Sequence, residues 1–131
     1  MSKIPGAIGT LRKARRMSEI PAVTLESASD RARQVRALYE ILEQRLNGRV
    51  WSLHELMIGF SHEVGYVGRL ILANDGTWEI GSDPKSELEY KLAESLWWIF
   101  VLAGRLDIDI TAAFNQTMDR MHASLQAEVD T

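Results

Sequence analysis

Two glutamates lie inside apolar helical stretches, where a carboxylate is unexpected. Glu63 is in LMIGFSHEVGYVGRLIL, residues 56–72, and the apolar residues at helical spacing around it are Leu56, Phe60, Val67 and Leu70. Glu94 follows 31 residues later within YKLAESLWWIFVLA. An ionised carboxylate removed from water costs several kcal/mol unless it is paired, hydrogen-bonded or bound to a metal. Both acids therefore require a partner.

Two kinds of partner fit these acids. Carboxylates that project inward from neighbouring helices can hold Mg²⁺ or Mn²⁺, and such a metal can then bind phosphate oxygens and activate water. Alternatively, each acid pairs with a cation of the chain, such as Arg69, Lys91 or Arg105. Spacing alone leaves both alternatives open.

Other site chemistries lack their usual motifs. The sequence contains no P-loop, no G-x-G-x-x-G and no H-E-x-x-H pattern, and it has no cysteine for a thiolate site. His54 and His62 are eight residues apart, about two helical turns, which is too far for the two side chains to share one metal without further ligands. We expect them to be surface histidines.

The composition is that of one compact domain. The chain has 131 residues, of which 46% are hydrophobic, and this is enough apolar material for a core. The lack of cysteine favours an intracellular setting. No apolar run reaches the roughly 18 residues of a membrane span, and no secretory signal is evident, so we expect a cytoplasmic protein without a membrane partner.

Charge is divided unevenly along the chain. Residues 1–20 carry five basic residues against Glu19, so this segment has a net charge of +4 within a chain whose total is −3. We interpret residues 1–27, which also contain Pro5 and Pro21, as a basic N-terminal arm with a short helical possibility at residues 8–17. Residues 28–131 form the predicted domain. The five cations of this arm have no aromatic residues between them on which bases could stack, so we do not expect a nucleic-acid partner.

Helical periodicity and capping signals predict four long helices and an all-α bundle. The expected N-caps are Ser29 or Asp30, Ser52, Asp83 and Asp109. Asn47 and Gly48 should end the first helix, and the third should run to about Leu106 as a buried central helix. The second helix should turn its apolar residues inward, including Met57, Val64 and Ile71.

Two further features of the helices predict close packing. Gly59, Gly65 and Gly68 interrupt the second helix at a cost of about 1 kcal/mol each relative to alanine, which indicates close approach of another backbone or of a ligand, and we expect tight packing. The fourth helix has a near-heptad apolar stripe consisting of Phe114, Met118, Met121 and Leu125. This stripe could pack within the bundle or against a second copy of the chain.

A family resemblance rests on the segments around the two acids. HEVGYVGRLI and KLAESLWWIFVLAGRLDIDI resemble the two hallmark helices of the MazG-like, all-α nucleoside triphosphate pyrophosphohydrolases, in register from about residue 50 to residue 113. In that family the first helix carries an E-x-x-E metal motif and the later helix carries E-x-x-D. Glu63 matches the first acid, and Glu94 replaces the final Asp. Tyr66 and Lys91 stand where the other two acids belong.

The resemblance implies a reaction and a site. Family members use Mg²⁺ to cleave a nucleoside triphosphate into a monophosphate and pyrophosphate, generally within dimers. Glu63 and Glu94 would be the catalytic and metal-binding residues, supplemented by Glu55, Glu79 or Glu87. The implied binding residues are Trp51, Trp78 and Trp98 for a base and Arg69 and Lys85 for phosphates. The alternative is a non-catalytic MazG-like module that binds nucleotide or only oligomerises.

Overall fold

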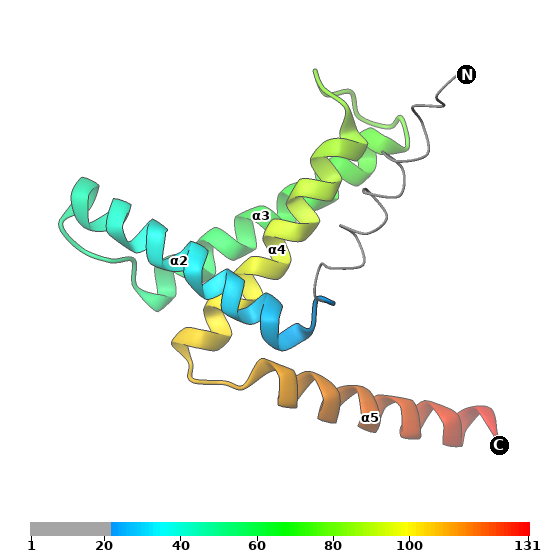
Figure 1. Ribbon diagram of the computed structural model, residues 1–131. Coiled ribbons are helices and arrows are strands. Elements are labelled where there is room, and N and C mark those ends of the chain that lie inside the picture. The colour runs from blue at the N-terminus through cyan, green and yellow to red at the C-terminus, as the bar shows by residue number, and fades with distance from the viewer. Residues whose placement is uncertain (1–21) are drawn as a thin grey trace, which may run out of the picture.

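The computed structural model describes residues 22–131, in which four helices pack as a bundle (Figure 1). The predicted short helix at residues 8–17 and most of the basic arm lie outside the described residues. The helices are α2 (Leu25–Asn47), α3 (Leu53–Asn74), α4 (Pro84–Arg105) and α5 (Ile110–Val129). No strand occurs within residues 22–131. The all-α prediction is therefore confirmed for this part of the chain.

Helix ends follow from side chains that satisfy free backbone groups. Ser52 and Glu55 form a reciprocal capping box at the start of α3, as predicted. Asp83 and Asp109 cap α4 and α5. Gly48 ends α2 with φ of 69°, a left-handed conformation that glycine adopts without steric cost.

The predicted start of the first helix was wrong. Thr24, rather than Ser29 or Asp30, caps α2, and it exchanges hydrogen bonds with Ser27 in a capping box. This capping box was hard to recognise in the sequence, because the third residue of the helix is Ser27, whereas the common signature has glutamate or glutamine at that position.

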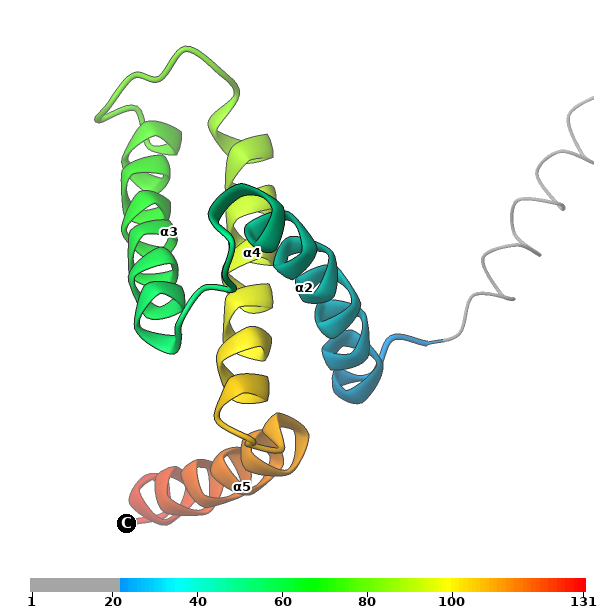
Figure 2. The ribbon, with the colours of Figure 1, turned by 90° about the vertical axis from the view of Figure 1, so that its left-hand side faces the viewer.

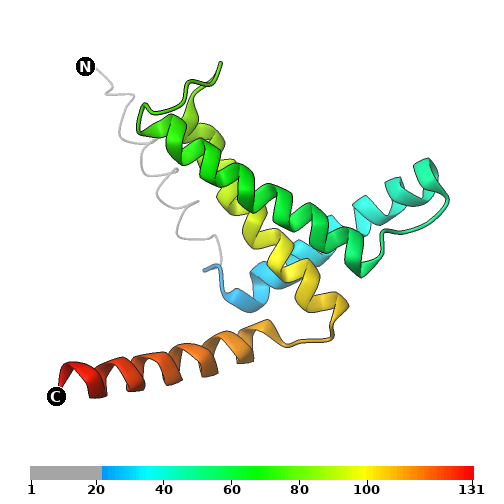
Figure 3. The same ribbon diagram turned by 180° about the vertical axis from the view of Figure 1, so that it is seen from behind.

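The centre of the fold is the antiparallel pair of α3 and α4, which lie side by side along most of their length (Figures 2 and 3). Leu56 and Leu70 of α3 are completely buried, and Phe100 and Val101 of α4 are buried as well. Leu56 and Leu70 are seven residues to either side of Glu63, which is itself largely buried, with 19% of its side chain exposed. The predicted inward position of Glu63 is confirmed.

Helix α2 crosses α4 (Figure 1). Trp97 fixes the crossing, because its indole Nε1 donates a hydrogen bond of 3.1 Å to the carbonyl oxygen of Ala32. The ring of Tyr39 lies 5.4 Å from the ring of Trp97, in a tilted arrangement favoured by aromatic pairs. This crossing places aromatic residues of α2 and α4 next to the two acids.

Much of the apolar surface stays exposed in a single chain. Met57, Val64 and Ile71 are exposed, although they were predicted to face inward, and the predicted burial of the third helix is incomplete because Leu92 and Leu96 are exposed. No helix of the described chain covers these faces.

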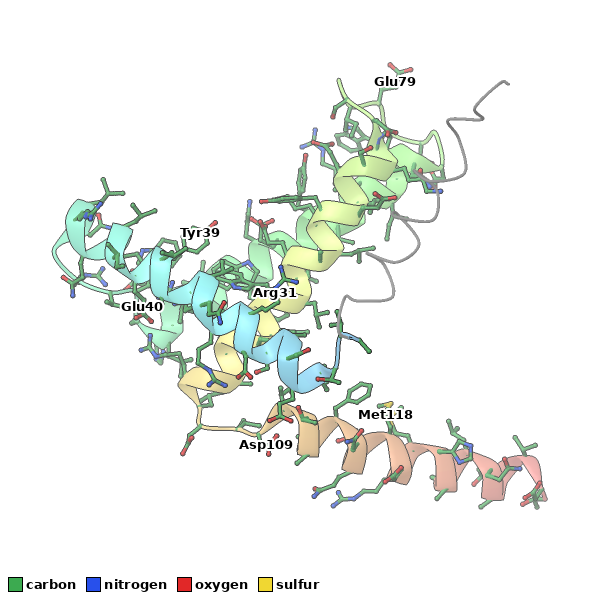
Figure 4. The ribbon with its side chains drawn as sticks, in the orientation of Figure 1. Arg31, Tyr39, Glu40, Glu79, Asp109 and Met118 are labelled. Carbon is green, nitrogen blue, oxygen red and sulfur yellow. The ribbon has the colours of Figure 1, made fainter. Side chains whose placement is uncertain are left out.

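Helix α5 projects away from the other three (Figure 1) and has no buried residue. Its predicted stripe is exposed from end to end, from Phe114 at 50% to Leu125 at 61%. Met118 marks the side of α5 that faces the other helices in Figure 4. The stripe therefore has no partner over most of its length within residues 22–131.

The three glycines of α3 have different surroundings. A Cβ at Gly59 would lie 2.7 Å from Cη2 of Trp98, so glycine is required for this close approach. The expected close packing is confirmed there. The expectation of close packing is wrong for Gly65 and Gly68 within a single chain, because a Cβ at either position would meet nothing within 4 Å.

Candidate functional site

Lys91 lies between the two predicted site acids and binds both. Its Nζ donates hydrogen bonds of 2.6 Å to Oε2 of Glu63 and 3.1 Å to Oε1 of Glu94. All three side chains are largely buried, with exposed fractions of 19–23%. Helical spacing explains the arrangement: Lys91 and Glu94 are three residues apart on α4, and α3 presents Glu63 to both. The cation-pair alternative is the arrangement found.

The pKa shifts of Glu63 and Lys91 favour the charged forms of these two side chains. Burial alone would raise the pKa of Glu63, but the hydrogen bond from Lys91 and the nearby positive charge outweigh burial and lower it. The hydrogen bond to Glu63 raises the pKa of Lys91 despite its burial. Counted by formal charge, one ammonium faces two carboxylates, and the sum for the cluster is −1.

Two tyrosines enclose Lys91. The Nζ atom lies 5.6 Å from the ring centroid of Tyr66 and 5.7 Å from that of Tyr90, both within cation–π range. Tyr66 occupies the position of a metal-binding acid in the MazG-like pattern. In this chain it contacts a cation through its ring face instead.

The residues around this cluster do not fit Mg²⁺. A divalent cation needs several oxygen ligands, but an ammonium bonded to both acids occupies the position between them. Within residues 22–131 no group of three or more acidic, histidine or cysteine side chains is arranged to hold a metal ion. At two of the four acid positions of the motif that the sequence resembles, Tyr66 and Lys91 supply no carboxylate.

Two of the three supplementary acids are not available to complete such a site. Glu55 is bound by Arg49 at 2.6 and 3.2 Å and caps α3, and these contacts lower the pKa of Glu55 to about 2. Glu79 projects from the loop between α3 and α4 (Figure 4), 12 residues before Lys91 in the sequence. Glu87 lies one helical turn before Lys91, and its Oε2 is buried without a hydrogen-bond partner in the described chain.

Three of the five predicted binding residues lie away from the acids. The guanidinium of Arg69 stacks on Trp78 at 5.0 Å, and Lys85 is in the first turn of α4. Arg69 is six residues beyond Glu63, or about 9 Å along the helix axis. Lys85 is nine residues before Glu94, or about 14 Å. The other two, Trp51 and Trp98, lie beside the acids.

A cleft of about 380 Å³ opens next to the acids, between α2 and the α3–α4 pair. We call it the aromatic cleft and define it by six of its lining residues: Tyr39, Trp51, Glu63, Glu94, Trp97 and Trp98. Its volume is within the range of small-molecule sites. The structure thus brings Trp51 and Trp98 together with both predicted acids and adds two aromatic residues, Tyr39 and Trp97, that were not predicted to bind a ligand.

A buried ion pair in this cleft was missed in the sequence. Arg36 donates hydrogen bonds of 2.6 and 2.8 Å to the two oxygens of Glu43, and Oε1 of Glu43 also accepts one of 2.7 Å from the backbone N–H of Trp51. Burial would raise the pKa of Glu43, but these bonds lower it. The two residues are seven apart, and this spacing puts them on one helix face, which is the signal that was available.

Within residues 22–131, none of the helices combines the length and apolar character needed to cross a membrane.

The chain matches no protein-family model, no curated protein sequence and no solved structure. The resemblance to the MazG-like family therefore rests on the residues quoted above and on the all-α fold.

Proposed function

We propose that this chain is a non-catalytic, MazG-like helical module that self-associates. The observation that carries the proposal is the Lys91 ammonium, which lies 2.6 and 3.1 Å from the two acids that would bind the catalytic metal. An ammonium at this position repels a divalent cation and already neutralises part of the carboxylate charge.

The test is an assay of the purified protein with Mg²⁺ or Mn²⁺ against canonical and modified nucleoside triphosphates, in which monophosphate is resolved from diphosphate. We expect no monophosphate or pyrophosphate above the level of a Glu63→Gln variant. The double variant Tyr66→Glu, Lys91→Glu restores the four-acid pattern, so it should gain Mg²⁺-dependent turnover if the fold is MazG-like.

The alternative function is a nucleotide pyrophosphohydrolase, and one observation favours it: Glu63 and Glu94 do lie together beside a cleft. In that case wild-type protein will release monophosphate and pyrophosphate, and Glu63→Gln will abolish the reaction. That result would contradict the non-catalytic proposal, because it requires Lys91 to leave the acids when nucleotide and metal bind.

Self-association is supported by the apolar faces that a single chain leaves uncovered. A 20-residue helix without buried residues is only marginally stable in water, so α5 requires a partner along its stripe. Gly65 and Gly68 are open toward solvent next to the exposed Val64 and Ile71, which suits close approach of another helix. A second copy carries the same faces and can bury them symmetrically.

We expect charges on the α5 stripe to separate the copies. Met121→Glu with Leu125→Glu should shift the sedimenting species from dimer or larger to monomer and reduce the helix content of α5. The matched control, Gln116→Glu with Ala123→Glu, adds the same two charges to the opposite face and should leave the mass unchanged. A wild-type protein that sediments as a monomer at high concentration would contradict this proposal.

A further inference from the structure

The aromatic cleft has walls suited to a cation. Tyr39 comes from α2, Trp51 from the segment between α2 and α3, and Trp97 and Trp98 from α4. The ring planes of Trp97 and Trp98 are inclined at 68°, and those of Tyr39 and Trp97 at 47°. Because the rings are not parallel, their faces are turned in different directions around the cleft that they line. Aromatic faces carry partial negative charge and attract ammonium and guanidinium groups.

Formal charges on the cleft add to this attraction. Arg36 and Glu43 cancel one another in their bidentate pair. Glu63 and Glu94 share the single positive charge of Lys91, so one negative charge remains uncompensated. Lys91 bonds Oε2 of Glu63 and Oε1 of Glu94 and leaves the second oxygen of each carboxylate without a bond to this ammonium.

An anionic ligand finds no free cation in this cleft. Among all the described residues that line the cleft, Arg36 is the only basic one. Both of its terminal nitrogens are bonded to Glu43. The predicted phosphate-binding residues Arg69 and Lys85 do not line it. A nucleoside triphosphate would therefore bring several negative charges toward a site that is already negative.

We propose that the aromatic cleft binds an organic cation with an apolar body, such as a quaternary alkylammonium group. Aromatic rings would contact the methyl groups, while Glu63 and Glu94 would compensate the charge. This inference goes beyond the proposed function and needs only the charge arrangement around Lys91. The absence of nucleotide hydrolysis is not part of the argument.

Tryptophan fluorescence of the full chain tests the proposal. A Trp78→Phe background removes the one tryptophan outside the cleft, so the signal comes from Trp51, Trp97 and Trp98. Choline is the cationic probe, and its neutral isostere, with carbon in place of nitrogen, is the control. We expect saturable binding of choline about tenfold tighter than the isostere, corresponding to a cation–π and charge contribution of about 1.4 kcal/mol.

Charge variants locate the binding. Glu63→Gln and Glu94→Gln should each weaken choline binding about fivefold relative to the isostere, as expected for loss of one nearby charge. Glu89→Gln makes the same change at an exposed position of α4 outside the cleft and should have no effect. If the two cleft variants unfold, salt provides a second test in the background protein. Choline binding should weaken with ionic strength, whereas binding of the isostere should not.

Three outcomes would overturn the inference. Equal affinity for choline and its isostere would mean that the cleft is merely apolar. No saturable binding of choline would mean that it does not accept a cation. Tighter binding of a nucleoside triphosphate than of choline would make it a nucleotide site. None of these results depends on hydrolysis, so the proposed lack of catalysis is judged separately.

Discussion

Replacing Glu43 with alanine will destabilise the protein by about 3–5 kcal/mol, the largest effect that we expect from a single substitution. The side chains of Arg36 and Glu43 are only 8% and 10% exposed, so the variant leaves a guanidinium buried without its carboxylate. It also removes the acceptor of the Trp51 backbone N–H, which anchors the segment between α2 and α3. Chemical denaturation with a two-state fit measures the change.

Two control variants separate charge burial from loss of contacts. Glu40→Ala removes a carboxylate that is 40% exposed and 3.5 Å from Nε of Arg36, so its effect should be much smaller. Arg36→Met combined with Glu43→Leu replaces both charges with apolar groups and should recover most of the loss. A cost for Glu43→Ala no greater than that for Glu40→Ala would show that the pair is not buried in solution.

Replacing Lys91 with alanine will create a binding site for divalent cations. Without the ammonium, Glu63 and Glu94 face each other uncompensated, and like charges this close favour uptake of a cation or a proton. At tenfold excess over the dissociation constant, Mg²⁺ or Mn²⁺ would stabilise the variant by about 1.4 kcal/mol, equivalent to a rise in Tm of several degrees. Thermal melts with and without the metal measure the effect.

The wild-type protein and Lys85→Ala should show no comparable rise in Tm. Lys85→Ala removes the same charge from the exposed first turn of α4, so it controls for a general gain of negative charge. If the metal stabilises wild-type protein equally, then Lys91 does not block the site, and the hydrolase alternative gains support.

The stabilisation from Lys91 should also depend on pH in a defined way. The pKa of Glu63 is lowered in the folded protein. The stabilisation from the Glu63 carboxylate is therefore present above pH 4.5, its ordinary pKa, and is lost as the pH falls through the lower pKa of the folded state. The pKa of Lys91 is raised in the folded protein. The stabilisation from the Lys91 ammonium is therefore present below pH 10.5, its ordinary pKa, and is lost as the pH rises through the higher pKa of the folded state. The Tm difference between wild type and Lys91→Ala should therefore be largest between these limits.

The four helices and most of their ends were predictable from local sequence. Ser52 with Glu55, Asp83 with Pro84, and Gly48 are local signals, because a cap satisfies backbone groups within a few residues of itself. The inward position of Glu63 was also local, since it follows from Leu56 and Leu70 on the same face. The start of α2 was missed because Thr24 and Ser27 make an uncommon version of the capping box.

The pairing of the charges and the contacts between aromatic residues depend on how the helices pack and were not predictable from the sequence. Lys91 was one of three candidate partners, and its choice depends on the antiparallel packing of α3 against α4. The aromatic cleft depends on the crossing of α2 over α4, which brings Tyr39 to Trp97 across 58 residues of sequence. Such contacts depend on helix packing angles, and the periodicity of a single helix does not contain that information.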